Sequence, residues 1–292
     1  MKRLALLLTF VLTLALPLNA ANIAWVSFHS ADDEPSTAAA DAGFAEAPDA
    51  GYTQLLRDNG HSVSRIVTSA TPNAGALNGY DLIIVSRSVP SGNYQNAGAT
   101  AWNSITAPMM VMSGYTIRNS RMGFTTGGTI PDTAVSVKLT AQVPSHPLFA
   151  GIPLDVGGLM VNDFANIVSF MGTTQRGISV NTDPLAGGGT LLATVGTPGD
   201  PATGGMVIGE WAAGATMGNG TADILAGPRL VFLSGSREHN GLTSEGAGIF
   251  DLTGDGAQLF LNAVNYIAVP EPSSLALLAV GGLAFIQRRK RR

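Results

Sequence analysis

The stretch Tyr80-Asp81-Leu82-Ile83-Ile84-Val85-Ser86 decides the fold of this 292-residue chain. It is an almost continuous apolar run with no alternation of polar and apolar residues. Such a run is typical of a strand that is covered on both faces, as strands are in a parallel sheet. It therefore predicts a central strand with helices on both sides of its sheet.

The segments around this strand alternate between strand and helix patterns. Strands are predicted at 22–28, 62–67 and 109–112, and helices at 51–59 and 100–106. Asp49 is placed to cap the helix over 51–59, and Gly60 is placed to end it. Strands separated by helices in this rhythm predict an α/β fold with a doubly wound, mostly parallel sheet.

The second half of the chain carries shorter strand patterns between Gly, Pro and Asp turns. These patterns lie at 135–139, 167–171, 177–180, 191–195 and 206–211. We expect some of them to extend the sheet and others to form a small β-rich insertion. A further buried strand at 229–234 and a helix over 256–267, capped by Thr253 or Asp255, close the domain.

Several short motifs resemble the class I glutamine-amidotransferase-like, ThuA-type flavodoxin-like domains. They are DLIIVS at 81–86, HPLFAGI at 146–152, GEW at 209–211, and LTGDG at 252–256 leading into LNAVNY at 261–266. The resemblance implies a doubly wound sheet with any site at the carboxyl ends of its strands. True glutaminases of this group carry a cysteine on a tight elbow, where this chain has Met112-Ser113-Gly114. The resemblance therefore implies a domain without cysteine-dependent glutaminase activity.

The last residues form a three-part tail. Pro270-Glu271-Pro272 is followed by an apolar run at 275–286 and a basic end at 288–292. As a helix the apolar run would be about 18 Å long, which is short for a bilayer core of about 30 Å. An ordinary C-terminal anchor is one interpretation. The order of the parts, however, closely resembles the PEP-CTERM sorting signal of Gram-negative bacteria. That resemblance implies recognition of Pro270, Glu271 and Pro272 by an exosortase in the inner membrane, removal of the helix and basic end, and transfer to the cell surface or exopolysaccharide.

The first residues have the pattern of a secretory signal peptide. A Lys2-Arg3 pair precedes an apolar run at 4–18 and small residues that end in Ala20 and Ala21. We expect cleavage after one of these alanines. The predicted organisation is a signal peptide at 1–20, an amidotransferase-like α/β domain at 21–268 and a sorting tail with a short transmembrane helix at 269–292. The expected location is the cell surface or extracellular matrix, after transient anchoring in the inner membrane.

The charge of the central domain differs from that of the whole chain. Seven of the 16 basic residues and one of the 20 acidic residues lie in the two ends, which leaves 9 basic and 19 acidic residues and a net charge of −10. So acidic a surface repels phosphate backbones and argues against nucleic-acid binding. The chain has no cysteine, which excludes disulfides and thiolate chemistry. No glycine-rich phosphate loop precedes a helix, and no cofactor is predicted.

Polar residues follow several predicted strands, and we expect them to meet at one edge of a parallel sheet. The candidate ligand cleft consists of His29, Asp32, Arg87, Ser113, Tyr115, Glu210 and His239. Among them, His29, Glu210 and His239 are the candidates for acid–base catalysis, since two imidazoles and a carboxylate suffice for such chemistry. The same three types of group could bind a metal, but their spacing matches no metal motif, and no metal is predicted. Solvated loop residues are the alternative interpretation.

Two classes of function remain. One is a non-catalytic surface or matrix protein whose domain binds a glycan or an envelope partner. The other is an envelope hydrolase or sugar-modifying enzyme that uses the His/Glu cluster. The absence of cysteine and of a tight catalytic motif favours the first. A mixture of acidic and basic groups, such as Glu210 with Arg87, favours a neutral or weakly charged glycan as the ligand.

Overall fold

The protein is described by a computed structural model that covers residues 20–268. The predicted signal peptide up to Asn19 and the predicted tail from Val269 lie outside these residues. Over the range described, no helix is both long enough and apolar enough to span a bilayer. The predicted transmembrane helix at 275–286 lies outside that range.

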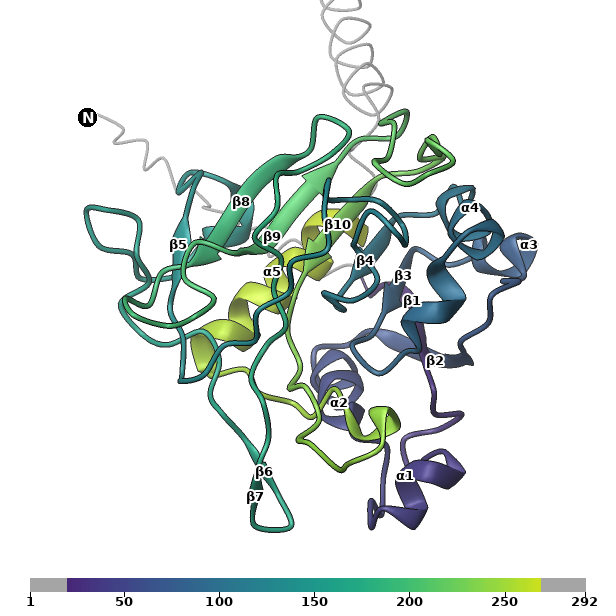
Figure 1. Cartoon of the computed structure of the whole chain (residues 1–292), viewed down its shortest axis with the longest axis horizontal. Helices are drawn as coiled ribbons and strands as arrows, with labels where there is room; N and C mark the ends of the chain where they lie inside the picture. Colours follow the sequence, from purple (N-terminus) through teal and green to yellow (C-terminus); the bar gives the residue numbers. More distant parts are fainter. Residues whose placement is uncertain (1–19, 269–292) are drawn as a thin grey trace, which may run out of the picture.

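An eight-stranded sheet in the order β2-β1-β3-β4-β10-β9-β8-β5 forms the centre of the domain (Figure 1). The first five strands in this order run parallel to one another. The strands of the sheet are β1 (Asn22–Ser27), β2 (Ser62–Val67), β3 (Leu82–Val85), β4 (Met109–Val111), β5 (Leu139–Ala141), β8 (Thr190–Val195), β9 (Met206–Trp211) and β10 (Arg229–Phe232). The predicted mostly parallel α/β sheet is confirmed.

Helices and short 3-10 turns connect these strands. They are α1 (Thr37–Asp41), α2 (Ala50–Asp58), α3 (Ala74–Leu77), η1 (Ser91–Tyr94), α4 (Ala97–Asn103), η2 (Pro147–Phe149), η3 (Ser244–Gly246) and α5 (Gly254–Ala268). Aromatic contacts show which helices share a face. Tyr52 on α2 stacks on Trp25 of β1 and meets Phe260 of α5 edge-on, so α2 and α5 cover the same face of the sheet. The right-handed crossovers from β2 to β3 and from β3 to β4 place α3 and α4 on the other.

Strand β3 is the centre of the core, as the sequence predicts. All four of its residues are fully buried. Ile84 pairs with Trp25 of β1 on one side and with Met110 of β4 on the other. A strand with neighbours on both sides and helices on both faces has no surface for polar side chains, which explains the continuous apolar run.

The antiparallel strands β9, β8 and β5 extend the sheet beyond β10. A separate two-stranded hairpin, β6 (Ser169–Phe170) with β7 (Thr173–Thr174), projects away from the sheet (Figure 1). The second half therefore contains both an extension of the sheet and a small β-rich insertion, as predicted. Because β9 runs opposite to β10, residues near its carboxyl end lie beside the start of β10.

The two predicted helix caps have different outcomes. The Thr253 hydroxyl accepts a hydrogen bond from the Gly256 amide at 3.2 Å and so caps the first turn of α5. Asp49 occupies the cap position of α2 without a side-chain capping bond. Its carboxylate instead accepts hydrogen bonds from the Trp25 indole, the Ser27 hydroxyl and the Arg65 guanidinium. The Asp49 carboxylate therefore binds the buried Arg65 guanidinium and does not cap α2.

Candidate functional site

A cluster of arginines around Tyr115 lies at the carboxyl ends of β3, β4 and β10. Arg87 follows β3, Tyr115 follows β4 and Arg237 follows β10, so the parallel strands deliver all three to one edge. The Cζ atoms of Arg87, Arg118 and Arg237 lie 5.4, 5.3 and 5.0 Å from the centre of the Tyr115 ring. At these distances the guanidinium charges are attracted to the electron-rich faces of the ring. We call this group the arginine–tyrosine cluster.

Two carboxylates balance part of the charge in the arginine–tyrosine cluster. Glu238 lies 3.3 Å from Arg87 and 3.5 Å from Arg176, and Asp132 lies 2.7 Å from Arg237. With Arg176 counted, four arginines face two carboxylates, and this group of side chains carries net positive charge within a strongly acidic domain. Burial lowers the pKa of Arg87 and raises that of Tyr115, so at neutral pH the tyrosine stays uncharged.

Several polar atoms at this edge have no hydrogen-bond partner among the described residues. They are the Nε atoms of Arg87 and Arg237 and the hydroxyls of Ser113 and Ser236, all of them buried. Buried polar groups in proteins are normally paired with protein or with ordered water. The edge therefore retains capacity to donate hydrogen bonds to water or to a bound molecule.

Ser113 lies beneath this edge and does not line a cleft. Its side chain is fully buried, and its hydroxyl has no base within hydrogen-bond distance among the described residues. A Cβ atom added to the next residue, Gly114, would lie 2.2 Å from the carbonyl oxygen of Ser179, so the segment around Ser179 covers the end of β4. The carboxyl end of β4 around Ser113 is thus closed.

His29 occupies the point where the strand order reverses, between β1 and β3. Its Nδ1 accepts a hydrogen bond from the Ser36 amide at 2.9 Å, so the neutral ring carries its proton on Nε2, which donates to the Ser88 hydroxyl at 3.0 Å. Burial lowers the pKa of His29 and keeps the ring neutral. Since both nitrogens have partners and the side chain is fully buried, His29 holds two loops together and closes the switch-point crevice.

His239 and Asp32 also follow strands but have different surroundings. His239 uses its Nδ1 proton for the Asn240 carbonyl at 2.8 Å, and its backbone amide donates to Gln175. Asp32 forms ion pairs with Arg57 and Arg65. Burial alone would raise the pKa of Asp32, but hydrogen bonds from Thr53 and the two arginines hold that pKa below its usual value.

The expectation that Glu210 shares this edge is wrong. Glu210 lies near the carboxyl end of the antiparallel strand β9 and pairs with Leu230 at the start of β10. Its carboxylate accepts a hydrogen bond from the Tyr266 hydroxyl at 2.9 Å and lies 3.6 Å from His146. It is therefore at the opposite edge of the sheet from His29 and His239. The His29–Glu210–His239 cluster is not formed, and the catalytic hypothesis that rests on it fails. Within residues 20–268, no three His, Asp or Glu side chains are grouped so as to hold a metal.

A polar pocket of about 510 Å³ lies beside the start of α4. It is formed by the loops that follow β3 and β4 and by part of the loop between β9 and β10. Its lining, which contains no carboxylate, is Gln95, Asn96, Asn119, Ser120, Arg121, Asn219, Gly220 and Thr221. We call it the amide pocket. Its connection to the arginine–tyrosine cluster is short, since Arg118 contacts Tyr115 and immediately precedes Asn119.

The backbone of the amide pocket is strained. Asn96 has φ 50° and ψ −127°, a conformation normally adopted by glycine, and Ala222 next to Thr221 has φ 48°. Met171 is the one other non-glycine residue in the described range with a positive φ. Such conformations cost of order 1–3 kcal/mol each and concentrate at binding sites. Sequence patterns carry no signal for these backbone angles, and the sequence analysis missed the pocket.

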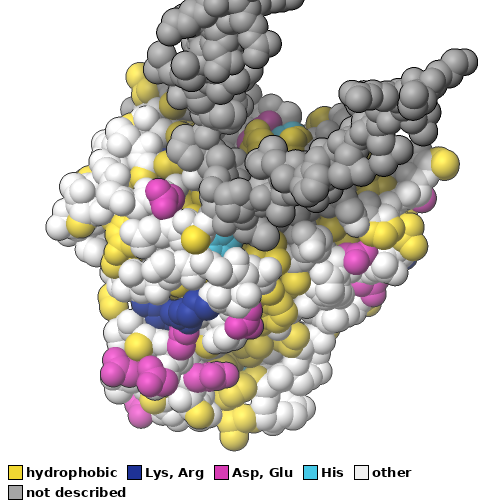
Figure 2. All heavy atoms as spheres, turned by 180° about the vertical axis from the view of Figure 1, so that it is seen from behind, with side chains coloured by type: hydrophobic (Ala, Val, Ile, Leu, Met, Phe, Trp, Pro, Cys, Tyr) yellow, Lys and Arg dark blue, Asp and Glu magenta, His cyan; other side chains and the backbone are white. Residues whose placement is uncertain are grey.

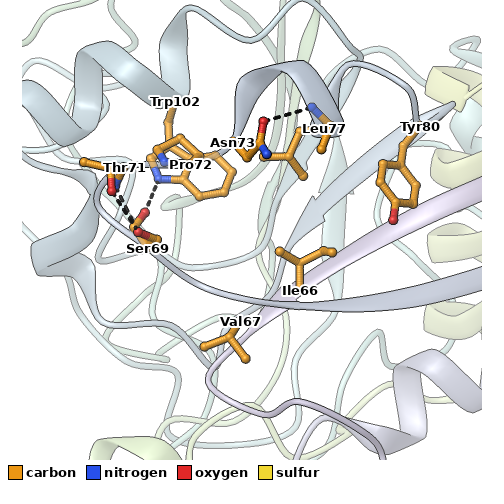
Figure 3. Close-up of a pocket in the computed structure, with 10 residues that line it drawn as sticks. Ile66, Val67, Ser69, Thr71, Pro72, Asn73, Leu77, Tyr80 and Trp102 are labelled. Carbon is orange, nitrogen blue, oxygen red and sulfur yellow. Dashed lines mark hydrogen bonds between the residues drawn. The ribbon is translucent and has the colours of Figure 1, made fainter.

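A second pocket, of about 340 Å³, lies beside the edge strand β2 (Figure 3). Ser69 and Thr71 lie near the Trp102 ring, whose Nε1 donates to the Ser69 carbonyl at 2.9 Å. Tyr80 lies on the other side of the pocket, with Ile66 between them. None of its lining residues is charged, and aliphatic and aromatic side chains form much of its wall. It offers fewer hydrogen-bonding groups to a hydroxyl-rich ligand than the amide pocket does.

Comparison with known proteins agrees with the predicted sorting tail and with the predicted fold of the domain. Residues 268–292 match the PEP-CTERM protein-sorting motif. No curated protein sequence matches the chain. Among solved structures, a ThuA-like protein from Bacteroides uniformis superposes with a TM-score of 0.50 at 11% identity, over 87% of this chain and 92% of that one.

Two further solved structures are more distant. A GMP synthase protein from Thermoplasma acidophilum is 12% identical, with a TM-score of 0.40 over 85% of this chain and 94% of that one. A PurLQS structure from Thermotoga maritima is 14% identical, with a TM-score of 0.32 over 84% of this chain and 99% of that one. The sorting motif implies export, processing by an exosortase and sorting to the cell surface. The chain thus joins a domain with the fold of a ThuA-like protein to a C-terminal PEP-CTERM protein-sorting motif.

Proposed function

We propose that this is an exported surface or exopolysaccharide-associated protein of a Gram-negative bacterium, whose domain at 21–268 binds a hydroxyl-rich glycan in the amide pocket. The observation that carries the binding proposal is the pocket's lining of amides, hydroxyls and one arginine without a carboxylate. Sugar hydroxyls both donate and accept hydrogen bonds, and side-chain amides offer both functions at one position. The volume lies within the range of about 300–1,000 Å³ that small-molecule sites occupy.

Some pocket groups are available to a ligand and others are fixed by the protein. The side chains of Gln95 and Asn96 make no hydrogen bond with any described residue. Asn219 and Thr221 instead donate to the carboxylate of Asp223, which also accepts from Thr100 and Asn103. Burial would raise the pKa of Asp223, but these hydrogen bonds keep that pKa below its usual value. Asp223 therefore holds one wall of the pocket in place, while Gln95 and Asn96 remain free to bind.

Replacing Asn96 with Gly is expected to weaken glycan binding while leaving the domain at least as stable. Glycine adopts a positive φ without strain, so the free energy of unfolding should rise by up to about 1 kcal/mol. Loss of the amide removes one or two hydrogen bonds to the ligand, which corresponds to roughly a fivefold or greater loss of affinity. Calorimetric titration with a panel of soluble oligosaccharides, together with thermal melting, measures both effects.

Met171→Gly is the matched control for this experiment. Met171 also has a positive φ, but it lies at the tip of the β6–β7 hairpin and outside the pocket. Its replacement should relieve backbone strain without changing glycan affinity. If Asn96→Gly binds every oligosaccharide as tightly as the wild type, the amide pocket is not the binding site.

The proposed sorting predicts a defined mature chain. Protein recovered from the surface of its native host should begin near Ala21 and end near Pro270, as measured by intact mass. Replacement of Glu271 with Ala should prevent processing and leave the basic end attached. A mature surface protein that still carries Arg288 to Arg292 would contradict processing by an exosortase.

A further inference from the structure

The arginines of the domain differ in whether the protein itself neutralises them. Most of the nine basic residues in 21–268 have partners within the domain. Five arginines form ion pairs: Arg57 and Arg65 with Asp32 or Asp49, Arg87 and Arg176 with Glu238, and Arg237 with Asp132. Arg229 and Lys138 donate hydrogen bonds to backbone carbonyls. Arg118 and Arg121 form no ion pair with any described carboxylate. Two unpaired arginines are unexpected where 19 acidic residues accompany nine basic ones.

Both unpaired arginines are held in place by neutral groups. The Nε of Arg118 donates to the Tyr115 carbonyl at 3.0 Å, and its Nη2 lies 3.4 Å from the Ser91 hydroxyl. The Nη1 of Arg121 donates to the carbonyl and the hydroxyl of Ser120 at 2.8 and 3.3 Å. Each guanidinium therefore keeps free N–H groups in a fixed orientation, and the buried Nε of Arg121 has no partner among the described residues.

The two arginines belong to one loop beside the pocket. Arg121 lines the amide pocket, and Arg118 is three residues before it in the same loop. Burial and the neighbouring charge of Arg118 together lower the pKa of Arg121. Like charges in one loop without a counterion are stabilised when an anion binds near them.

We infer that the glycan bound in the amide pocket is acidic, and that Arg118 and Arg121 bind the carboxylate of a uronic acid residue. This inference rests on the proposed function and names the class of its ligand. A planar carboxylate matches the forked geometry of a guanidinium, and the amides of Gln95 and Asn96 serve the sugar hydroxyls. The charge around the site favours a monoanion over a phosphate, because Asp223 lies behind the pocket wall and the domain carries a net charge of −10.

The distribution of charge also supports a local recognition of this kind. On the face shown in Figure 2, acidic side chains occur in several places, whereas Lys and Arg gather in one patch. Because the domain carries a net charge of −10, long-range attraction does not draw a polyanion to it, and short-range pairing has to provide the selectivity. An acidic polysaccharide whose charges are spaced by neutral hydroxyl-rich rings meets this requirement.

The test compares each acidic oligosaccharide with its own methyl ester. Oligogalacturonate, oligomannuronate and glucuronate-containing oligosaccharides are titrated into the mature protein by calorimetry at low and at physiological salt, beside their methyl esters and neutral oligosaccharides. The ester keeps every ring hydroxyl and loses the charge. At least one acid should bind roughly tenfold or more tightly than its ester, and the difference should shrink at the higher salt concentration.

Variants of the two arginines locate the effect. Arg121→Gln and Arg118→Gln should lower the affinity for the acid about tenfold or more and lower the affinity for the ester much less, so that the acid loses its advantage over the ester. Lys138→Gln removes the same charge next to β5, at the far end of the sheet, and should bind like the wild type. Equal binding of acids and esters, or binding of neutral glycans alone, overturns the inference and leaves the proposed function standing. If no oligosaccharide of either kind binds, the proposed function falls as well.

Discussion

Replacement of Ile84 with Asp is expected to unfold the domain. Ile84 is fully buried in β3, with Trp25 and Met110 as its neighbours on the adjacent strands. A carboxylate placed there has no partner, so it costs several kcal/mol or takes up a proton. Because single domains are stable by only about 5–15 kcal/mol, this change removes most of the stability. Thermal melting followed by circular dichroism measures it.

Val67→Asp provides the comparison for this variant. Val67 also lies in the sheet, at the end of the edge strand β2, but 55% of its surface is exposed. The new carboxylate remains in water there, so the melting temperature should change little. An Ile84→Asp protein that melts like the wild type would show that β3 is not in the core.

The second large effect concerns Asp251, whose ionisation should make the domain less stable as the pH rises. Burial raises the pKa of this carboxyl from 3.8 to about 7. Between these values the unfolded chain releases the proton while the folded protein keeps it, so folding becomes less favourable with increasing pH. The loss amounts to about 4 kcal/mol by pH 7, at about 1.4 kcal/mol per unit of pKa.

Asp251→Asn should remove this pH dependence. Asparagine keeps an oxygen for the Tyr52 hydroxyl and the Gly235 amide, which bond Oδ1 of Asp251 at 2.8 and 3.0 Å, and it does not ionise. Urea denaturation at pH 5 and pH 8 should show that the variant gains stability relative to the wild type at the higher pH. Asp41→Asn, an exposed position, should show no such gain. If the stability difference between wild type and Asp251→Asn is the same at both pH values, the carboxyl is already ionised in the folded protein at pH 5.

The parallel half of the sheet could be predicted from the sequence because burial on both faces leaves a direct signature. The apolar run at 80–86 is typical of a strand covered on both faces, and the helix predicted at 51–59 has its apolar residues on one face. Arg87 and Tyr115 were placed at the correct edge for the same reason, since parallel strands all end on one side.

The position of Glu210 could not be predicted in this way. An alternating or apolar pattern identifies a strand but not its direction, and β9 runs antiparallel to its neighbour. His29 was predicted near the correct edge. No sequence pattern indicates, however, that its two ring nitrogens form hydrogen bonds with the Ser36 amide and the Ser88 hydroxyl. The amide pocket depends on the backbone angles of Asn96 and on a loop from the other half of the chain, neither of which leaves a pattern in the sequence.

The first and last described residues of the domain lie at the same edge of the sheet as Glu210. Strand β1 begins at Asn22, and α5 ends at Ala268 beside Tyr266 and Glu210, so both described ends of the chain lie at the edge where the parallel strands begin. Arg87 and Tyr115, which follow β3 and β4, lie at the other edge. If the proposed surface protein is attached through its C-terminal end, it presents Arg87 and Tyr115 on the side away from the attachment. On the proposed bacterial surface, this polarity would direct the arginine–tyrosine cluster toward material outside the cell.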